Sequence, residues 1–269
     1  EYKLSQLHKI RKPAAEKVAN ALFDALKNTL DPEEMRWVGR IEEKRKVLNS
    51  SSKEISRTDF GAGKANLDRT EDEMYQGVVT ETTVGEVCRI ASKPYFWSLF
   101  LFKLNREFKP LVCIELGTCL GISGAYQASA QKLNNNGRLI TLEGAKSVAS
   151  LAEENFQQLG LDNVQVVTGR FQDNIDSVLA ENKTVDYAFI DGHHDEKATI
   201  FYFEKIRPHL SKNAILVFDD ISWADGMRRA WKHIVKNKHI KISLYLGVVG
   251  VCVLDENIDE KYNIRIPML

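Results

Sequence analysis

The feature that most constrains the fold is an alternation of short apolar runs and amphipathic helical stretches that begins near residue 111. The apolar runs are Leu111–Glu115, Arg138–Leu142, Val164–Val167, Val185–Ile190 and Ile215–Phe218. Helical periodicity follows each of them, near residues 122–132, 146–159, 171–181, 195–207 and 225–236. Strands that alternate with helices indicate parallel βαβ units with right-handed crossovers, so helices should cover both faces of the sheet.

The end of the chain departs from this alternation. The runs Ile240–Leu246 and Val248–Leu254 are rich in β-forming residues and are separated by little more than Gly247. No helix fits between them, so they must pair as an antiparallel hairpin. The sequence therefore predicts an α/β fold whose doubly wound, mostly parallel, seven-stranded sheet is Rossmann-like and ends in an antiparallel hairpin. A nucleotide-dependent dehydrogenase sheet does not end in this way.

The N-terminal part of the chain lacks the alternation of strands and helices. Apolar residues between Val18 and Leu30 recur at helical spacing, and Asp31-Pro32-Glu33-Glu34 is typical of a helix N-cap and first turn. Residues 50–80 are polar, contain the segment Asp59-Phe-Gly-Ala-Gly63 and predict a loop too long to be a simple connector. We expect a helical region over 1–107 and a ligand-binding α/β domain over 108–269.

Composition excludes several classes of partner. The chain has 37 basic and 37 acidic side chains, so no overall positive field attracts nucleic acid or anionic lipid. Its 4 cysteines form no CxxC pair, which favours free thiols in a reducing compartment over a disulfide or zinc framework. The sequence shows no signal peptide and no apolar run long enough to span a bilayer. We therefore expect a cytoplasmic protein without a nucleic-acid or membrane partner.

A glycine-containing segment, Glu115-Leu-Gly-Thr-Cys-Leu-Gly-Ile-Ser123, joins the first predicted strand to the following helix. Gly117 and Gly121 allow a tight turn and a close approach of the backbone to a ligand, at the sheet edge where open α/β sheets bind ligands. The second strand ends at Glu143, about twenty residues later, where an acid can accept hydrogen bonds from ribose hydroxyls. The alternatives are a tight turn without a ligand and an acid that interacts with a helix dipole.

These residues resemble motif I and the following acidic motif of class I S-adenosylmethionine-dependent methyltransferases. The pattern is particularly similar to the catechol and caffeoyl-CoA O-methyltransferase type, although Cys119 stands where many methyltransferases have a central glycine. The resemblance implies S-adenosylmethionine as cofactor, with Gly117 and Gly121 along its methionine moiety, Ser123 on its carboxylate and Glu143 on its ribose. The cofactor-binding set that it implies is Glu115, Gly117, Thr118, Gly121, Ser123, Glu143, Gly144, Arg170, Phe171 and Asp191.

The competing cofactor is NAD. A short-chain dehydrogenase would carry a Tyr-x-x-x-Lys pair, but none of the 8 tyrosines is followed by lysine at that spacing. The predicted terminal hairpin also argues against a dehydrogenase fold.

Three acids follow neighbouring strands. Asp191 ends the fourth predicted strand and Asp219-Asp220 ends the fifth, so the three carboxylates should meet at one crevice. Clustered carboxylates repel one another unless a cation compensates, and a hard divalent ion such as Mg²⁺ prefers these oxygen ligands. Such an ion could also bind a substrate hydroxyl and lower its pKa. The positions resemble the metal site of metal-dependent O-methyltransferases. The alternatives are one acid that contacts substrate or cofactor without metal, and Asp220 as a helix cap.

Two histidines follow Asp191. A neutral imidazole near the acceptor could take its proton, and we assign this role to His194, with Asp191 as the second catalytic residue. Catechol-type enzymes have a lysine at the position of His194, which leaves a structural role open. Trp223, Asp225 and Met227 are candidates for the wall of the acceptor pocket.

The reaction expected from these residues is methyl transfer from S-adenosylmethionine to an oxygen of a small molecule, assisted by a divalent metal. The alternatives are a metal-independent methyltransferase acting on nitrogen, carbon or a macromolecule, and a domain that only binds the nucleoside. The helical region and the 56–70 loop should cover the acceptor site or form a homodimer interface.

Overall fold

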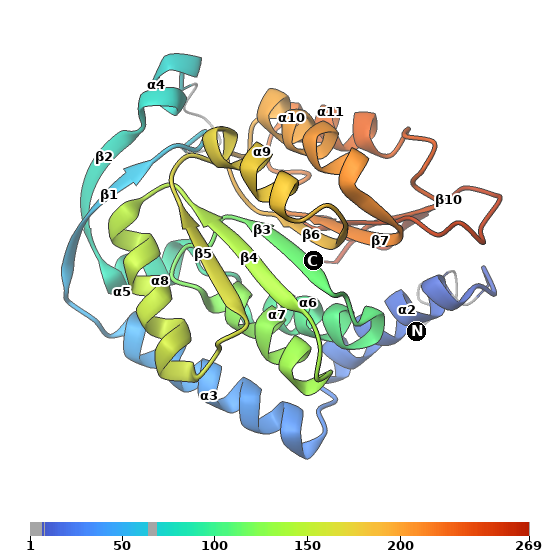
Figure 1. The fold of residues 1–269 in the computed structure, drawn as a ribbon, viewed down its shortest axis with the longest axis horizontal. Coiled ribbons are helices and arrows are strands. Elements are labelled where there is room, and N and C mark those ends of the chain that lie inside the picture. Colours follow the sequence, from blue (N-terminus) through green and yellow to red (C-terminus); the bar gives the residue numbers. More distant parts are fainter. Residues whose placement is uncertain (1–6, 8, 64–68, 269) are drawn as a thin grey trace.

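The computed structural model describes residues 7, 9–63 and 69–268, and its centre is a twisted sheet with helices on both faces (Figure 1). In this described part the sheet has eight strands in the order β10-β8-β9-β7-β6-β3-β4-β5. Their bounds are β3 (Val112–Leu116), β4 (Arg138–Glu143), β5 (Val164–Thr168), β6 (Val185–Ile190), β7 (Leu210–Phe218), β8 (Ile242–Tyr245), β9 (Gly250–Val253) and β10 (Tyr262–Arg265). Strands β3 to β7 are mutually parallel, which confirms the predicted doubly wound sheet.

The predicted terminal hairpin is confirmed, because β8 pairs antiparallel with β9 and β9 pairs antiparallel with β7. The eighth strand, β10, was not predicted; it pairs parallel with β8 at the edge of the sheet. Only Ile264 of its four residues is buried. A strand with one buried side chain has no alternating apolar pattern by which the sequence could reveal it.

Two apolar cores lie on opposite faces of the sheet. Successive residues of a strand point to opposite faces, so Cys113 belongs to one core and Ile114 to the other. The first core is covered by α2 (Pro13–Lys27), α3 (Pro32–Asn49), α5 (Val84–Ala91), α6 (Tyr95–Phe108), α7 (Ile122–Leu133) and α8 (Lys146–Leu159). The second is covered by α9 (Phe171–Glu181), α10 (Glu196–Ile206) and α11 (Asp225–Ile234), and the 3₁₀ turn Arg207–His209 directly follows α10.

The N-terminal helices share the first core with the helices of the α/β region. Helix α3 begins as its sequence indicates, with the side chain of Asp31 accepting the backbone N–H groups of Glu33 and Glu34 at 2.8 and 2.9 Å. Because α2 and α3 pack on the same apolar layer as α7 and α8, the N-terminal region is not a separate core. The predicted division between residues 107 and 108 stays a prediction.

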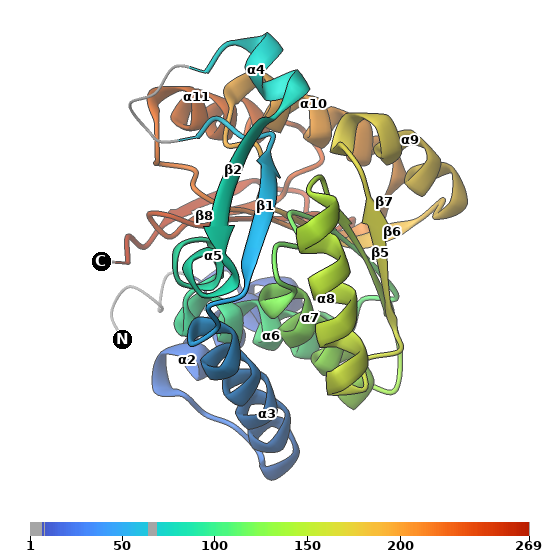
Figure 2. The same cartoon turned by 90° about the vertical axis from the view of Figure 1, so that its left-hand side faces the viewer.

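The region for which the sequence predicts a polar loop contains an antiparallel ribbon, β1 (Glu54–Asp59) paired with β2 (Val78–Thr83), and the short helix α4 (Glu71–Gln76). Only Ile55 of the ribbon residues is buried, so periodicity could not reveal these strands. Figure 2 shows the ribbon running from α5 to α4 beside α8, and Ser147 of α8 donates to the carbonyl of Ser56 at 2.6 Å. Residues 64–68 of the expected 56–70 loop lie outside the described residues.

None of the helices in the described ranges combines the length and apolar character needed to cross a bilayer.

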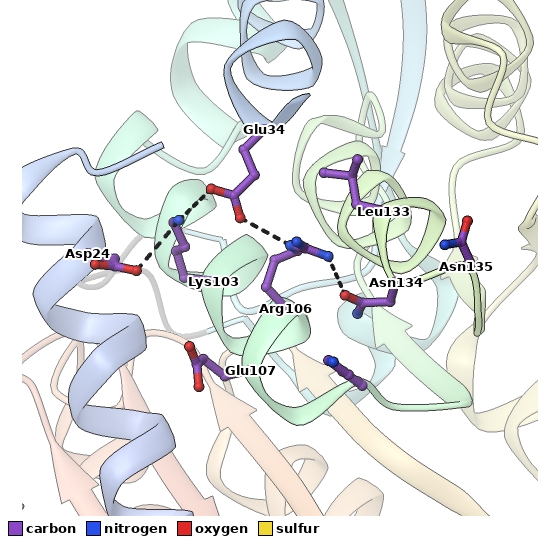
Figure 3. Close-up of a pocket in the computed structure, with 9 residues that line it drawn as sticks. Asp24, Glu34, Lys103, Arg106, Glu107, Leu133, Asn134 and Asn135 are labelled. Atoms are coloured by element: carbon purple, nitrogen blue, oxygen red, sulfur yellow. Dashed lines mark hydrogen bonds and ion pairs between the residues drawn. The ribbon is translucent and has the colours of Figure 1, made fainter. Parts of the chain in front are cut away.

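A charged cluster ties α3 to α6. Glu34 is buried and its two oxygens accept Lys103 Nζ at 2.6 Å and Arg106 Nε at 3.0 Å, as Figure 3 shows. Lys103 also lies 3.6 Å from Asp24 of α2. These side chains line a cavity of about 390 Å³ that lies away from the carboxyl ends of the strands. The cluster therefore connects the N-terminal helices α2 and α3 to α6 by ion pairs.

Replacement of Glu34 by Gln should destabilise the fold, because it leaves the buried ammonium of Lys103 without its main counter-charge. Removal of one partner of a buried ion pair costs about 3–5 kcal/mol. Urea unfolding followed by circular dichroism measures the loss. Glu43→Gln is the matched control, since Glu43 pairs with Lys46 on the exposed face of the same helix and should leave the midpoint unchanged. Equal midpoints for the two variants would contradict the assignment.

Candidate active site

The turn after β3 is shaped by its close approach to β6. Gly117 has φ +109°, and its N–H and that of Thr118 both donate to the carbonyl of Leu142, at 3.0 and 3.1 Å. A Cβ on Gly117 would lie 2.1 Å from the carbonyl oxygen of Asp191. Gly121, at φ +82°, is the N-cap residue of α7 and is covered by the ring of Phe156. Both glycines are therefore required by the packing of the turn itself.

Glu143 faces this turn from the end of β4. Its Oε2 accepts the N–H of Cys119 at 2.8 Å, and its Oε1 accepts the N–H of Ala145 at 2.9 Å. Burial raises the pKa of Glu143, opposed by these two hydrogen bonds and by Arg57 of β1. The geometry places a carboxylate beside the glycine turn at the carboxyl edge of the sheet, where ligands bind in α/β folds of this type.

Glu115 lies beneath the turn and is fully buried. It accepts hydrogen bonds from Ser123 at 2.7 Å, Gln127 at 2.8 Å and Thr141 at 2.7 Å. Burial raises the pKa of Glu115 to about 7, against the effect of these hydrogen bonds. The hydroxyl of Ser123 is thus bound to Glu115, whereas the resemblance assigns it to the cofactor carboxylate. Thr118 is buried too, and its hydroxyl lies 2.6 Å from that of Thr141.

Of the other predicted cofactor residues, Arg170 and Phe171 lie at the start of α9, and Gly144 lies at the sheet edge. Arg170 lies on the outside, with its guanidinium 3.9 Å from the ring centroid of Tyr75 and its Nε 2.7 Å from Asp173. Phe171 packs edge-on against His193 below the sheet edge. Gly144 lies at the edge itself, and Phe60 covers it, since a Cβ on Gly144 would lie 2.6 Å from the Phe60 ring.

Sequence reasoning did not assign Phe60 to the site, although it noted the segment Asp59–Gly63. The N–H of Ala62 donates to the carbonyl of His193 at 2.7 Å, so this segment lies across the edge between β4 and β6. The described part of the N-terminal region therefore contributes directly to the candidate site.

The structure brings Asp191, Asp219 and Asp220 together at the ends of β6 and β7. Burial and the charge of Asp219 raise the pKa of Asp191 well above its usual range. Burial also opposes ionisation of Asp219, but Lys93 and a hydrogen bond from Asp191 hold the Asp219 pKa below its ordinary value.

The cation within this cluster is Lys93, which the sequence analysis missed. Its Nζ contacts Asp219 Oδ2 and lies 3.3 Å from Asp191 Oδ2. Burial disfavours the ammonium, but the charges of Asp191 and Asp219 outweigh it and raise the pKa of Lys93. Lys93 lies between α5 and α6, far from the acids along the chain, and no motif or spacing connects it to them.

The two histidines have different surroundings. His193 Nδ1 lies 2.9 Å from the hydroxyl of Tyr202, and burial lowers the pKa of His193 to about 4, so its imidazole is neutral. His194 lies between two acids of the cluster, with Nε2 3.7 Å from Asp191 and Nδ1 3.6 Å from Asp220.

Of the three candidates for the pocket wall, one lies beside the cluster. The Trp223 ring is 5.9 Å from the His194 ring. Asp225 pairs with Arg228 on the surface, and Met227 is buried against Thr199.

Asp191, Asp219 and Asp220 are the candidate ligands for a divalent metal ion. The carboxylates have the right chemistry, but the ammonium of Lys93 lies between Asp191 and Asp219. Within the described ranges, no three or more His, Cys, Asp or Glu side chains are arranged to hold a metal ion. As arranged here, the residues do not fit a divalent ion unless Lys93 leaves. The predicted metal role of these acids stays a prediction.

Comparison with known proteins confirms the resemblance inferred from the motifs. A family model described as a methyltransferase domain matches residues 114–221. Over 115 residues, 42% of this chain, the sequence is 36% identical to a catechol O-methyltransferase of Niastella koreensis. The match spans 50% of that relative, so the chain covers about half the length of the curated protein it resembles.

Solved structures share the fold. An O-methyltransferase of Bacillus cereus in complex with S-adenosylhomocysteine superposes with a TM-score of 0.54 at 22% identity, over 61% of this chain and 83% of that one. TomG of Streptomyces achromogenes, an O-methyltransferase in complex with S-adenosylmethionine, gives a TM-score of 0.55 at 19% identity, over 61% and 82%. The predicted fold, that of class I methyltransferases, is confirmed.

Replacement of Gly117 by Ala should destabilise the turn, because the new Cβ would collide with the Asp191 carbonyl and the positive φ disfavours an L side chain. We expect a loss of at least about 2 kcal/mol in urea unfolding. Gly39→Ala is the control. Gly39 lies in α3 with no atom within 4 Å of an added Cβ, so this change should stabilise the helix by about 1 kcal/mol. A neutral Gly117→Ala would refute the steric account.

The raised pKa of Glu115 predicts a pH-dependent contribution to stability. Between about 4.5 and about 7 the folded chain keeps a proton that the unfolded chain has lost, so this contribution falls as the pH rises. The stability of the wild type relative to Glu115→Gln should therefore fall by roughly 1–3 kcal/mol across this window. Urea unfolding at several pH values provides the measurement. Parallel stability curves for the two proteins would contradict the assignment.

Proposed function

We propose that this chain, which carries a methyltransferase domain within a class I methyltransferase fold, transfers a methyl group from S-adenosylmethionine to an oxygen atom of a small molecule. The observation that carries the proposal is the position of Glu143, whose carboxylate contacts the glycine turn after β3 at the carboxyl edge of the sheet. An oxygen acceptor is supported by the similarity to the catechol O-methyltransferase of Niastella koreensis.

Glu143 is suited to hold the ribose of the cofactor. Each of its two oxygens accepts one backbone N–H, and a carboxylate has about four acceptor sites in total. Two acceptor sites therefore remain for ribose hydroxyls. The backbone of the turn between Gly117 and Gly121 would lie along the methionine moiety, and Gly144 and Phe60 would border the base.

The acceptor would lie beside Asp191 and His194. The sulfonium of the cofactor already makes its methyl group labile, so the chain must align the acceptor oxygen, exclude water and accept a proton. Transfer of the methyl group from sulfur to the acceptor oxygen would leave a neutral thioether, and the imidazole of His194 would accept the hydroxyl proton. Asp191 and Asp220, at 3.7 and 3.6 Å from His194, would stabilise the imidazolium.

We further propose that the region 1–107 covers the acceptor site. This is supported by Lys93, which belongs to this region and lies at the acidic cluster. The homodimer and the assistance by Mg²⁺ through Asp191, Asp219 and Asp220 stay predictions. The place of Lys93 within the cluster favours a reaction without a divalent ion.

Calorimetric titration with S-adenosylmethionine tests the proposal. The wild type should bind the cofactor, and Glu143→Ala should weaken binding by roughly 10- to 100-fold, because hydrogen bonds to a charged group contribute about 1.5–3 kcal/mol. Glu153→Ala, an exposed change in α8, is the matched control and should leave the affinity unchanged. If the wild type does not bind the cofactor, or if Glu143→Ala binds it as well as the control does, the proposed function is wrong.

A further inference from the structure

An ammonium group lies inside the acidic cluster of the candidate acceptor site. The side chain of Lys93 is 10% exposed, and its Nζ contacts Asp219, which is 2% exposed, and lies 3.3 Å from Asp191. An ammonium has three N–H donors, and these two acids account for two of them. A third donor would remain for an oxygen of a bound acceptor.

Hydrogen bonds to the backbone carbonyl of Lys93 fix the position of this residue. Its carbonyl oxygen accepts Arg45 Nη1 of α3 at 2.9 Å and the hydroxyl of Ser98 of α6 at 3.0 Å. Arg45 is in turn paired with Glu42 at 3.0 Å, and Glu42 accepts the hydroxyl of Tyr126 of α7 at 2.7 Å. The backbone of Lys93 is thus anchored by side chains of α3 and α6, which distinguishes it from a surface lysine that happens to lie near an acid.

The ammonium of Lys93 already occupies the space between the carboxylates of Asp191 and Asp219. A divalent ion bound by the same oxygens would lie within a few ångströms of the ammonium, and the repulsion between two cations at that distance is large in a buried site. Metal and Lys93 therefore exclude each other.

We propose that Lys93 is the resident cation of the acceptor site, that it takes the place of a divalent metal ion between Asp191 and Asp219, and that it positions the acceptor oxygen. The inference rests on the proposed function for the identity of the acceptor site. The exclusion of metal by Lys93 is independent of it.

Titration with Mn²⁺, followed by the electron paramagnetic resonance signal of the free ion, tests the exclusion directly. The wild type should not take up Mn²⁺ at this site. Lys93→Ala leaves the carboxylates without a counter-charge and opens space, so it should bind one Mn²⁺ at least roughly tenfold more tightly than the wild type does. The additional change Asp219→Asn should abolish this gain. Lys93→Arg keeps the charge and should behave as the wild type does.

The control is Lys46→Ala, which removes an exposed lysine of α3 and should not create Mn²⁺ binding. Mn²⁺ uptake by the wild type that is lost in Asp219→Asn would overturn the proposal, and this measurement does not depend on how Lys93→Ala folds. A folded Lys93→Ala that gains no Mn²⁺ would overturn it as well. In turnover, the wild type should be unaffected by EDTA, whereas failure to bind S-adenosylmethionine would refute the proposed function and leave the Mn²⁺ result standing.

Discussion

The pairing of Lys93 with Asp219 and Asp191 is the interaction on which the candidate site depends. Carboxylates that are buried this deeply cannot carry charge without a cation, and the ammonium that compensates them comes from the connection between α5 and α6. The N-terminal helices are therefore required for the charge balance of the site as well as for the core. Any change that shifts α6 relative to β7 would separate the ammonium from its partners.

The second constraint is the close packing of the strand ends. Gly117 leaves no room for a Cβ beside the backbone of Asp191, so the glycine turn and the acidic cluster are held in one rigid unit. Glu143 extends this unit to β4 through its hydrogen bond from Cys119. A nucleoside bound between Glu143 and the turn would have its reactive end directed along the edge toward β6 and β7, because parallel strands present all their carboxyl ends on one side.

The N-terminal region takes part in both structure and site. It shares an apolar core with α7 and α8, and its Glu34 cluster joins α3 to α6. The ribbon β1–β2 then leads the chain back over the sheet edge, where Phe60 lies on Gly144. This arrangement brings a region without a recognisable motif to the sheet edge that holds the candidate site.

The sequence by itself determined the sheet, its terminal hairpin and the positions of Glu143 and the three acids, because these follow from local periodicity and from the rule that parallel strands end at one edge. It could not reveal β1, β2 or β10, whose strands bury almost no side chains. The sequence could not predict the position of Lys93 in the acidic cluster, for a different reason. An ion pair between residues far apart in the chain leaves no periodic or spacing signal, and only the packing of α5 and α6 against the sheet decided which cation meets Asp219.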